Sequence, residues 1–379
     1  MHRPRRVLLV YALPHSGHSS AAAALQEELE GQGFEVCQYN FQEQWTRLGK
    51  KASGFQKWIV EHAPWVWRHA HGNKGYAGVT DFVVEQLTRW DITGLFAKIQ
   101  SYKPDAIIAT HFLPLRMLGE ARLSGYLPMP IFAVTTDLWV HRYWAHVGID
   151  QYFAATKQTK EHLVEYGINP ARVQVTGIPL RRVFFEKRVF SSRQARAKLG
   201  ITLQKPHVTI VGGSLGIFPF RDLLRAIVAE QKASSIQWTV IFGTDEKNLK
   251  RSKRFLRKYP QVSIQLLGFT KEIDLYFLAS DAVVTKPGGL TTCEVALSKV
   301  PLVLCSPIPG QEEGNAAILC SAQAAVREDD PALLVRKVLE LVASPPERQR
   351  LAKKAAQLVP GKSSHRIARA VETALEQKK

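Results

Sequence analysis

The residues that point most directly to chemistry lie at 285–294, where the sequence reads Thr-Lys-Pro-Gly-Gly-Leu-Thr-Thr-Cys-Glu. Residues 281–285 favour a buried strand and 290–297 favour a helix, so the two glycines form the turn between them. Adjacent glycines let the backbone approach a ligand closely, and the N–H groups at a helix start attract phosphate. Glu294 lies about one turn into this helix, where a carboxylate can accept hydrogen bonds from a ribose diol. The stretch predicts a nucleotide site, although an ordinary strand-to-helix turn with a surface glutamate explains these residues equally well on their own.

A second glycine turn, at 212–216, follows a predicted strand at 207–211. Ser214, Leu215 and Gly216 place backbone N–H groups at a predicted helix start, where they can bind a diphosphate. Lys286 can add a positive charge to the same group. A purely structural turn is the alternative for 212–216.

Asp137 follows a predicted strand at 130–136. Ligands bind outside the carboxyl ends of strands in open α/β sheets, so this is a good position for a catalytic carboxylate. A helix N-cap is the alternative for Asp137, and His141 can pair with it locally if the segment is helical.

Strands alternate with helical or loop sequence in both halves of the chain. In the first half they are predicted at 6–11, 33–36, 105–110, 130–136, 151–155 and 173–176, and in the second half at 207–211, 238–242, 262–266, 281–285 and 301–305. This alternation predicts an α/β protein with two doubly wound parallel sheets. Residues 186–204 are charged and lack an apolar stripe, so they are interpreted as a linker, with a possible short helix at 192–199. The end of the chain, at 347–376, is predicted to be helical and to close across a domain face.

The composition limits the class of partner. The 379 residues are 45% hydrophobic, carry a net charge of +18 from 51 Lys+Arg against 33 Asp+Glu, and contain no apolar run near the roughly 18 residues of a membrane span. No signal peptide is recognised at the start, so the chain is predicted to stay in the cytoplasm. The four cysteines lack C-x-x-C spacing, so no disulfide framework or zinc site is expected. The charge predicts a polyanionic partner, and without a nucleic-acid-binding motif we favour anionic lipid over nucleic acid.

Tryptophans are concentrated in a basic segment between Trp45 and Trp90. That segment holds five of the eight tryptophans of the chain, including Trp58, Trp65 and Trp67. Tryptophan favours the headgroup boundary, and nearby lysines and arginines are attracted to anionic lipid. The segment therefore predicts a monotopic membrane anchor, with a tryptophan-rich core insertion as the alternative.

Three motifs together resemble the donor half of a GT-B glycosyltransferase: the turn 212–216, the segment 285–294 and the run Pro-Gly-Gln-Glu-Glu-Gly-Asn-Ala at 309–316. More narrowly, they resemble the family of the monogalactosyldiacylglycerol synthases, the processive diacylglycerol glucosyltransferases and the lipid II glycosyltransferase. Gly17-His18 before an alanine-rich helix, and Thr135-Thr136-Asp137 with His141 and Trp144, are similar to the diacylglycerol branch. The resemblance covers most of the chain.

The resemblance implies two Rossmann-like domains that face each other across a cleft. It implies an acceptor and membrane-binding domain at 1–185, a linker at 186–204, a UDP-sugar domain at 205–346 and a C-terminal helix at 347–379 closing across the domains. It also implies an inverting reaction without a metal or other cofactor.

On the donor side, the resemblance adds a uracil contact from the backbone of Phe269 and a sugar contact from Gln311. A core aromatic and a solvated polar loop are the alternatives. The expected donor-binding residues are Gly213, Ser214, Leu215, Gly216, Phe269, Lys286, Gly288, Gly289, Leu290, Thr291, Glu294, Gln311, Glu312 and Asn315.

On the acceptor side, the resemblance makes His18 the expected base, because it follows Gly17 and precedes the predicted helix at 21–29. The family commonly has a glycine-rich run before this histidine, whereas this chain has one glycine, so His15 competes for the role. Asp137 is either the base itself or the group that orients His18. Gly17, His141 and Trp144 are expected at the acceptor, and Trp58, Trp65 and Trp67 at the membrane.

The sequence thus predicts transfer of glucose or galactose from UDP-glucose or UDP-galactose to diacylglycerol by a peripheral protein on the cytoplasmic face of the cell membrane. Rival hypotheses are transfer of UDP-GlcNAc sugar to a polyprenyl-linked acceptor, UDP-sugar 2-epimerisation, and a non-enzymatic nucleic-acid-binding role. The sequence does not distinguish glucose from galactose.

Overall fold

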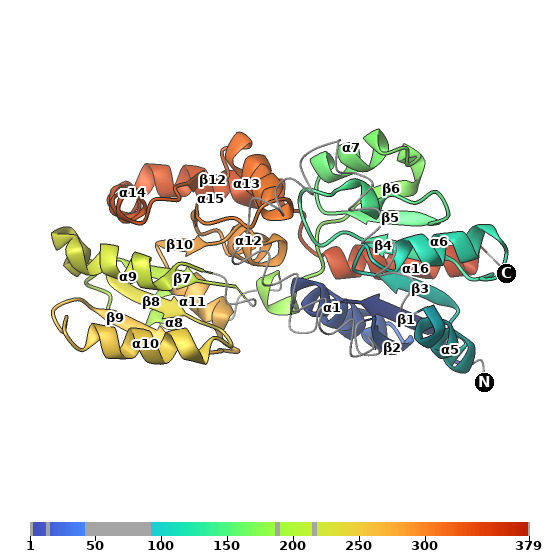
Figure 1. Ribbon diagram of the computed structural model, residues 1–379, viewed down its shortest axis with the longest axis horizontal. Helices are drawn as coiled ribbons and strands as arrows, with labels where there is room; N and C mark the ends of the chain where they lie inside the picture. The colour runs from blue at the N-terminus through green and yellow to red at the C-terminus, as the bar shows by residue number, and fades with distance from the viewer. Residues whose placement is uncertain (1–2, 13–15, 42–91, 186–189, 214–217, 378–379) are drawn as a thin grey trace. The chain divides into compact units, whose positions relative to one another are not determined.

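The computed structural model describes residues 3–12, 16–41, 92–185, 190–213 and 218–377. These form two compact units, each built on a six-stranded sheet (Figure 1). The first contains 1–181, 308–314 and 360–379, and the second contains 182–307 and 315–359. Every strand pairing within these described ranges is parallel, which confirms the predicted doubly wound α/β class.

The sheet of the first unit has the strand order β2-β1-β3-β4-β5-β6. Its strands are β1 (Arg6–Tyr11), β2 (Glu35–Asn40), β3 (Ala106–Ala109), β4 (Ile131–Val134), β5 (Gln151–Ala154) and β6 (Val173–Val175). Leu8 on β1 pairs with Cys37 on one side and with Ile107 on the other. The strand order therefore reverses between β1 and β3, and ligands bind at the carboxyl ends of the strands at such a reversal.

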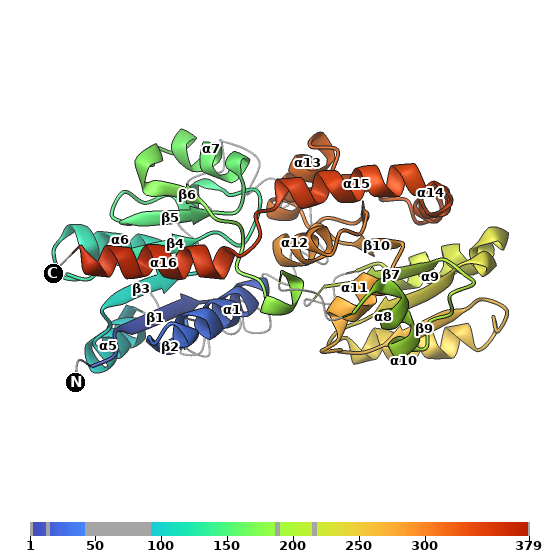
Figure 2. The same ribbon diagram turned by 180° about the vertical axis from the view of Figure 1, so that it is seen from behind.

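Alternate residues of β1 face two separate cores, because neighbouring side chains of a strand point to opposite faces. Val7 and Leu9 pack with helices α1 (Gly17–Gly31) and α16 (Ser363–Glu376), and Figure 2 shows α16 lying along the sheet. Leu8 and Val10 pack on the other face with α5 (Ile92–Tyr102) and α6 (Leu115–Leu123). Helix α7 (Lys157–Glu165) connects β5 to β6. Both faces are covered, as the apolar runs of the strands require.

The sheet of the second unit has the order β12-β11-β10-β7-β8-β9, which is the Rossmann order. Its strands are β7 (His207–Val211), β8 (Gln237–Ile241), β9 (Ile264–Leu267), β10 (Ala282–Thr285), β11 (Leu302–Leu304) and β12 (Ala325–Arg327). The order reverses between β7 and β10, which carry the two glycine turns at their carboxyl ends. Strand β12 was not predicted from the sequence.

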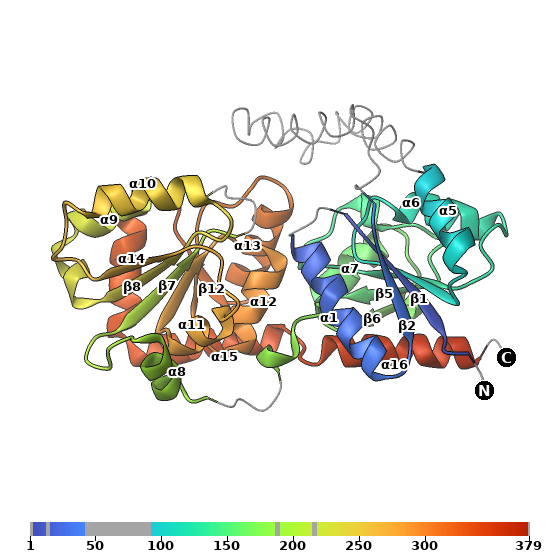
Figure 3. The same ribbon diagram turned by 90° about the horizontal axis from the view of Figure 1, so that it is seen from below.

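The helices of the second unit, several visible in Figure 3, are α8 (Ser192–Leu199), α9 (Phe220–Ala229), α10 (Glu246–Leu256), α11 (Ile273–Ala279), α12 (Gly289–Leu297), α14 (Pro331–Ala343) and α15 (Pro345–Leu358). Helix α13 (Gln311–Ser321) begins in the segment grouped with the first unit and continues in the second. Helices α9 and α14 contact each other and supply apolar side chains over Val208 and Ile210 of β7.

The short helix predicted at 192–199 is confirmed, whereas the linker predicted at 186–204 is wrong over its described part. Residues Ser192–Leu199 form α8, which packs on α11 inside the second unit. Arg196 of α8 is buried and donates hydrogen bonds to Ala279 O at 2.8 Å and to Asp281 Oδ2 at 2.6 Å. The segment resembles a linker in sequence because its buried side chains, Ala195, Arg196 and Ile201, include a charged one and form no apolar stripe.

The C-terminal segment predicted as one helix at 347–379 consists of two. Helix α15 ends at Leu358 in the second unit, and Pro360 and Gly361 separate it from α16 in the first unit. Pro360 cannot continue a helix that needs its N–H, which explains the break.

Candidate functional site

His18 lies in the first turn of α1, not in the loop before the predicted helix, because α1 begins at Gly17. Ser16 is the N-cap and forms a capping box with Ser19, which accounts for the earlier start. Helix α1 is the next element after β1 in the described chain, and His18 in its first turn lies where the strand order of the first sheet reverses.

Two threonines orient the His18 ring. Nδ1 lies 3.0 Å from Thr110 O and 2.6 Å from Thr136 Oγ1, on residues that follow β3 and β4. A carbonyl oxygen only accepts hydrogen bonds, so Nδ1 carries the ring proton and the lone pair is on Nε2. Among the described residues, Thr110 and Thr136 thus orient the His18 ring, and the role of Asp137 as base or orienting group stays a prediction.

Burial lowers the pKa of His18 to about 4, against the opposing effect of the hydrogen bond to Thr110. The imidazole is therefore neutral at physiological pH, with Nε2 able to accept a proton.

His111 is a site residue that the sequence analysis missed. It follows β3, and its ring meets that of His18 edge-on at a centroid distance of 4.4 Å. Its Nδ1 accepts a hydrogen bond from Leu113 N at 3.1 Å. Burial holds the pKa of His111 well below its usual value, and the neighbouring His18 and His141 lower it further. A histidine directly after the strand predicted at 105–110 was the signal that could have revealed it.

Asp137 and His141 are both buried, beyond the carboxyl end of β4. The His141 ring packs edge-on against Phe112 at 4.5 Å. The segment between them is not helical, and the short helix at Arg142–Trp144 has His141 as its N-cap, so neither the N-cap role for Asp137 nor a helical pair with His141 is correct. Trp144, expected at the acceptor, is 0% exposed and belongs to the hydrophobic core.

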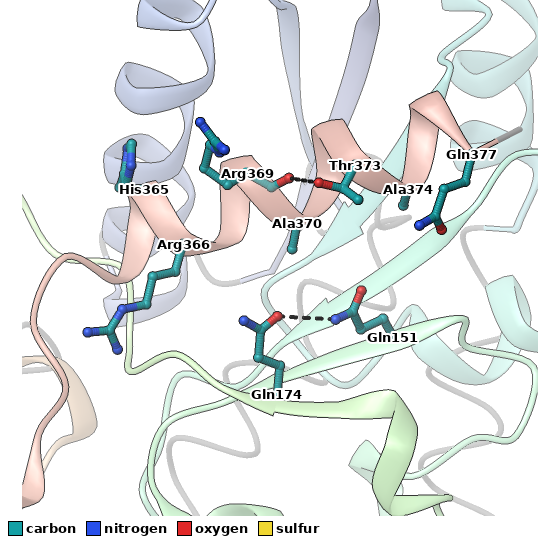
Figure 4. A pocket seen from close by; sticks show the side chains of 9 residues that line it. All are labelled: Gln151, Gln174, His365, Arg366, Arg369, Ala370, Thr373, Ala374 and Gln377. Atoms are coloured by element: carbon teal, nitrogen blue, oxygen red, sulfur yellow. Dashed lines mark hydrogen bonds between the residues drawn. The ribbon is translucent and has the colours of Figure 1, made fainter. Parts of the chain in front are cut away.

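A cavity of about 510 Å³ in the first unit lies elsewhere (Figure 4). It is bordered by Gln151, at the amino end of β5, and by Gln174, Arg366 and Arg369. His18 lies beyond the carboxyl end of β1, so this cavity is not part of the His18 site.

The donor turn of the second unit has the expected helix start. Helix α12 begins at Gly289, one residue before the predicted start, and its N-cap Gly288 has extended backbone and no side-chain cap. The hydroxyl of Thr292 donates to Gly288 O at 2.9 Å. The helix start therefore leaves the amides of Gly289, Leu290 and Thr291 uncapped by side chains, the arrangement that attracts phosphate.

The second glycine turn approaches the first at Lys286. Gly213 has a φ of +74°, and a Cβ at this position would lie 3.1 Å from Lys286 Cε. Lys286 is only 5% exposed. Gly213 and Lys286 thus lie together where the order of the second sheet reverses, while Ser214, Leu215 and Gly216 fall outside the described residues.

Asn315 supports the donor turn. Its buried Nδ2 donates to Pro287 O at 2.9 Å, so the side-chain amide of this expected donor-binding residue holds the backbone of the turn. Glu312, in the first turn of α13, accepts a hydrogen bond at 2.8 Å through Oε2 from Ile308 N in the preceding loop. Gln311 Nε2 is buried, and no described residue hydrogen-bonds it.

Phe269 is 72% exposed in the loop after β9, so the alternative of a core aromatic is wrong. Glu294 is half-buried in α12, one turn from its start. Trp58, Trp65, Trp67 and His15 lie outside the described residues. Among the described residues, no His, Cys, Asp and Glu side chains cluster in a way that would hold a metal ion. No described helix is long and apolar enough to cross a membrane.

Two family models match the chain. Residues 18–180 match monogalactosyldiacylglycerol (MGDG) synthase, and residues 207–370 match the C-terminal domain of glycosyltransferase family 28. Together the two matches include the residues near the strand-order reversal of each sheet: His18 for the first sheet, and the glycine turns at 212–216 and 285–294 for the second.

Solved structures share the fold. Acinetobacter baumannii MurG is 17% identical with a TM-score of 0.63, covering 98% of this chain and 100% of that chain. A putative UDP-N-acetylglucosamine 2-epimerase from Listeria monocytogenes is 16% identical with a TM-score of 0.67, covering 99% and 97%. The two units and their turns therefore define a protein of the GT-B class.

Curated relatives narrow the class. The processive diacylglycerol beta-glucosyltransferase of Bacillus pumilus (strain SAFR-032) is 29% identical over 83% of this chain and 81% of its own length. The enzyme of the same name from Bacillus subtilis (strain 168) is 31% identical over 67% of this chain and 65% of its own length. The chain belongs to the glycosyltransferase family that contains the monogalactosyldiacylglycerol synthases and the processive diacylglycerol glucosyltransferases.

Proposed function

We propose that this protein transfers glucose or galactose from a UDP-sugar to the hydroxyl of diacylglycerol, with inversion, at the cytoplasmic membrane surface. The observation that carries the proposal is the neutral His18 imidazole, whose Nε2 lone pair is oriented by Thr110 and Thr136 at the reversal point of the first sheet. The names of the curated relatives support diacylglycerol as acceptor.

In the proposed reaction, His18 Nε2 accepts the hydroxyl proton as the acceptor oxygen forms its bond to C1 of the sugar. The bond from C1 to the diphosphate breaks, and UDP leaves with the electron pair. The uncapped start of α12 and Lys286 compensate the charge that develops on the diphosphate, without a metal ion. Glu294 accepts hydrogen bonds from the ribose diol.

Peripheral attachment is part of the proposal. A surplus of positive charge attracts the protein to anionic lipid, and Trp58, Trp65 and Trp67 add contacts at the headgroup boundary.

Incubation with UDP-[14C]glucose or UDP-[14C]galactose and diacylglycerol in non-ionic micelles, followed by lipid extraction, tests the reaction. We expect label in the lipid phase from one or both donors. If lipid is labelled only when UDP-GlcNAc and a polyprenyl-linked acceptor are supplied, the protein has that transferase activity instead. If the free UDP-sugar is converted to its 2-epimer, the protein is an epimerase instead.

A further inference from the structure

Exposed positive charge is concentrated on helix α10 and the turn that follows it. Seven exposed basic residues lie within twelve positions: Lys247, Lys250, Arg251, Lys253, Arg254, Arg257 and Lys258. Lys247, Lys250, Arg251 and Arg254 recur at helical spacing, so they share one face of the helix.

The opposite face of α10 belongs to the core. Leu249, Phe255 and Leu256 pack against the hydrophobic cluster of the second unit, and Ser252 is buried. The helix therefore has no spare apolar residues with which to enter a bilayer or a protein groove, and its exposed face acts through charge alone.

Few carboxylates lie close enough to neutralise the positive charge of α10. Asp245 caps the helix through Asn248 N, and Glu246 pairs with Lys250 at 3.4 Å. On the neighbouring helix α9, Asp222 lies 3.9 Å from Arg225. Arg251 and Arg254 make no ion pair with any described residue, so their guanidinium groups are available to an external anion.

We propose that the basic face of α10 is a docking surface for an anionic bilayer, distinct from the tryptophan-rich segment. This proposal rests on the proposed function, which places the acceptor in a membrane. Single-stranded nucleic acid fits less well, because α10 offers no exposed ring for bases to stack on: Phe255 packs on the core and against Tyr259, with ring centroids 5.1 Å apart. Lysine and arginine side chains can reach headgroup phosphates while the helix stays on its own sheet.

The test uses the full chain and co-sedimentation with vesicles of phosphatidylglycerol mixed with phosphatidylcholine. Each basic residue near such a surface contributes about fivefold in affinity, so the double variant Arg251→Gln, Arg254→Gln should bind about 25-fold more weakly at low salt. The matched control is Lys353→Gln, Lys354→Gln on α15, which removes the same charge from exposed positions of the same unit. It should bind like the parent. The difference between variants should vanish near 1 M salt, where the Debye length is about 3 Å.

Equal binding by the α10 variant and the parent at low salt would overturn the proposal. Equal losses in both variants would also overturn it, because net charge rather than this surface would then be responsible. Retained vesicle binding with lost affinity for a duplex DNA oligonucleotide would assign the surface to nucleic acid instead. UDP titration calorimetry and circular dichroism confirm that each variant is folded.

The outcome is separable from that of the proposed function. Sugar transfer in non-ionic micelles does not need the α10 surface, so it should be unchanged in the α10 variant. Absence of transfer in the parent, together with vesicle binding that depends on α10, would reject the proposed activity and keep the docking surface.

Discussion

At the scale of single residues, the chemistry depends on how burial changes ordinary side chains. A free histidine is partly protonated near neutral pH, whereas the burial of His18 removes that competition and its Nδ1 partners fix the tautomer. His18 Nε2 is therefore unprotonated near neutral pH and can accept a proton without first releasing one.

We expect His18→Ala to lower kcat by about 10²–10⁴-fold with nearly unchanged UDP affinity, because a base acts chiefly in the transition state. Because the pKa of His18 in the ligand-free protein is about 4, the acid limb of kcat/KM for the parent should lie near that value rather than near 6.5. Steady-state kinetics across pH and UDP calorimetry measure both effects. His15→Ala is the control, and a larger loss there than in His18→Ala would show that the base is the other histidine.

Glu294→Ala should weaken UDP binding by about 1.5–3 kcal/mol, because it removes hydrogen bonds to a charged group. Vesicle binding should not change. Glu340→Ala, on the exposed face of α14 in the same unit, is the matched control. Calorimetry that finds the same UDP affinity in parent and Glu294→Ala would contradict the ribose contact.

Because His207 is buried, we expect the free energy of unfolding to fall as the pH is lowered. Burial lowers its pKa from 6.5 to about 4, with Arg196 acting in the same direction. Above the unfolded pKa both states are neutral, whereas between about 6.5 and 4 the unfolded chain binds a proton that the folded chain does not, so stability falls as pH falls. From about pH 7 to about pH 5 this histidine should account for about 2 kcal/mol. Amide hydrogen exchange of β7 and β8 should show a smaller pH dependence in His207→Gln than in the parent; an identical dependence would rule out this account.

At the scale of elements, α8 shows how one ionic cluster attaches a helix to a sheet. Asp281 receives hydrogen bonds from Arg196, Arg348 and His207 N. Burial alone would raise the pKa of Asp281, but these donors lower it, so the carboxylate stays charged.

Arg196→Ala should destabilise the second unit by about 2–3 kcal/mol, since it removes the arginine donor from the buried Ala279 O, from the partly buried Lys205 O and from the Asp281 carboxylate. Arg225→Ala removes an exposed pair with Asp222 and should cost less than about 0.5 kcal/mol. Urea unfolding measures both. If Arg196→Ala lowers the free energy of unfolding no more than Arg225→Ala does, the hydrogen bonds of Arg196 do not attach α8 to the second unit.

At the scale of the whole molecule, the first unit is built from segments at both ends of the chain. Helix α16 comes from the C-terminal end, yet its Ile367, Ala368 and Val371 are fully buried against the first sheet. Removing it would expose one face of that sheet to water.

A fragment of residues 182–359 should therefore fold alone and bind UDP, whereas residues 1–181 should aggregate unless 360–379 are supplied. Circular dichroism, sedimentation and UDP calorimetry on the three fragments make the comparison. A monomeric, cooperatively unfolding fragment 1–181 would show that α16 is dispensable for the first unit.

Local sequence patterns were enough to predict the α/β class, most of the strands and the glycine turn at 285–294. These are local properties: apolar runs such as 207–211 favour strands, and Gly288 and Gly289 permit a turn whatever surrounds them. The switch from strand to helix at 285–294 was predicted to within one residue for the same reason.

Which distant groups meet depends on the three-dimensional fold. Thr110 and Thr136 are 92 and 118 residues from His18, and they reach its ring because β1, β3 and β4 end at the same edge of the sheet. The same holds for His111 beside His18, Arg196 on Asp281, and α16 on β1. Hydrogen bonds and burial between such positions depend on strand order and helix packing, which no local pattern of residues specifies.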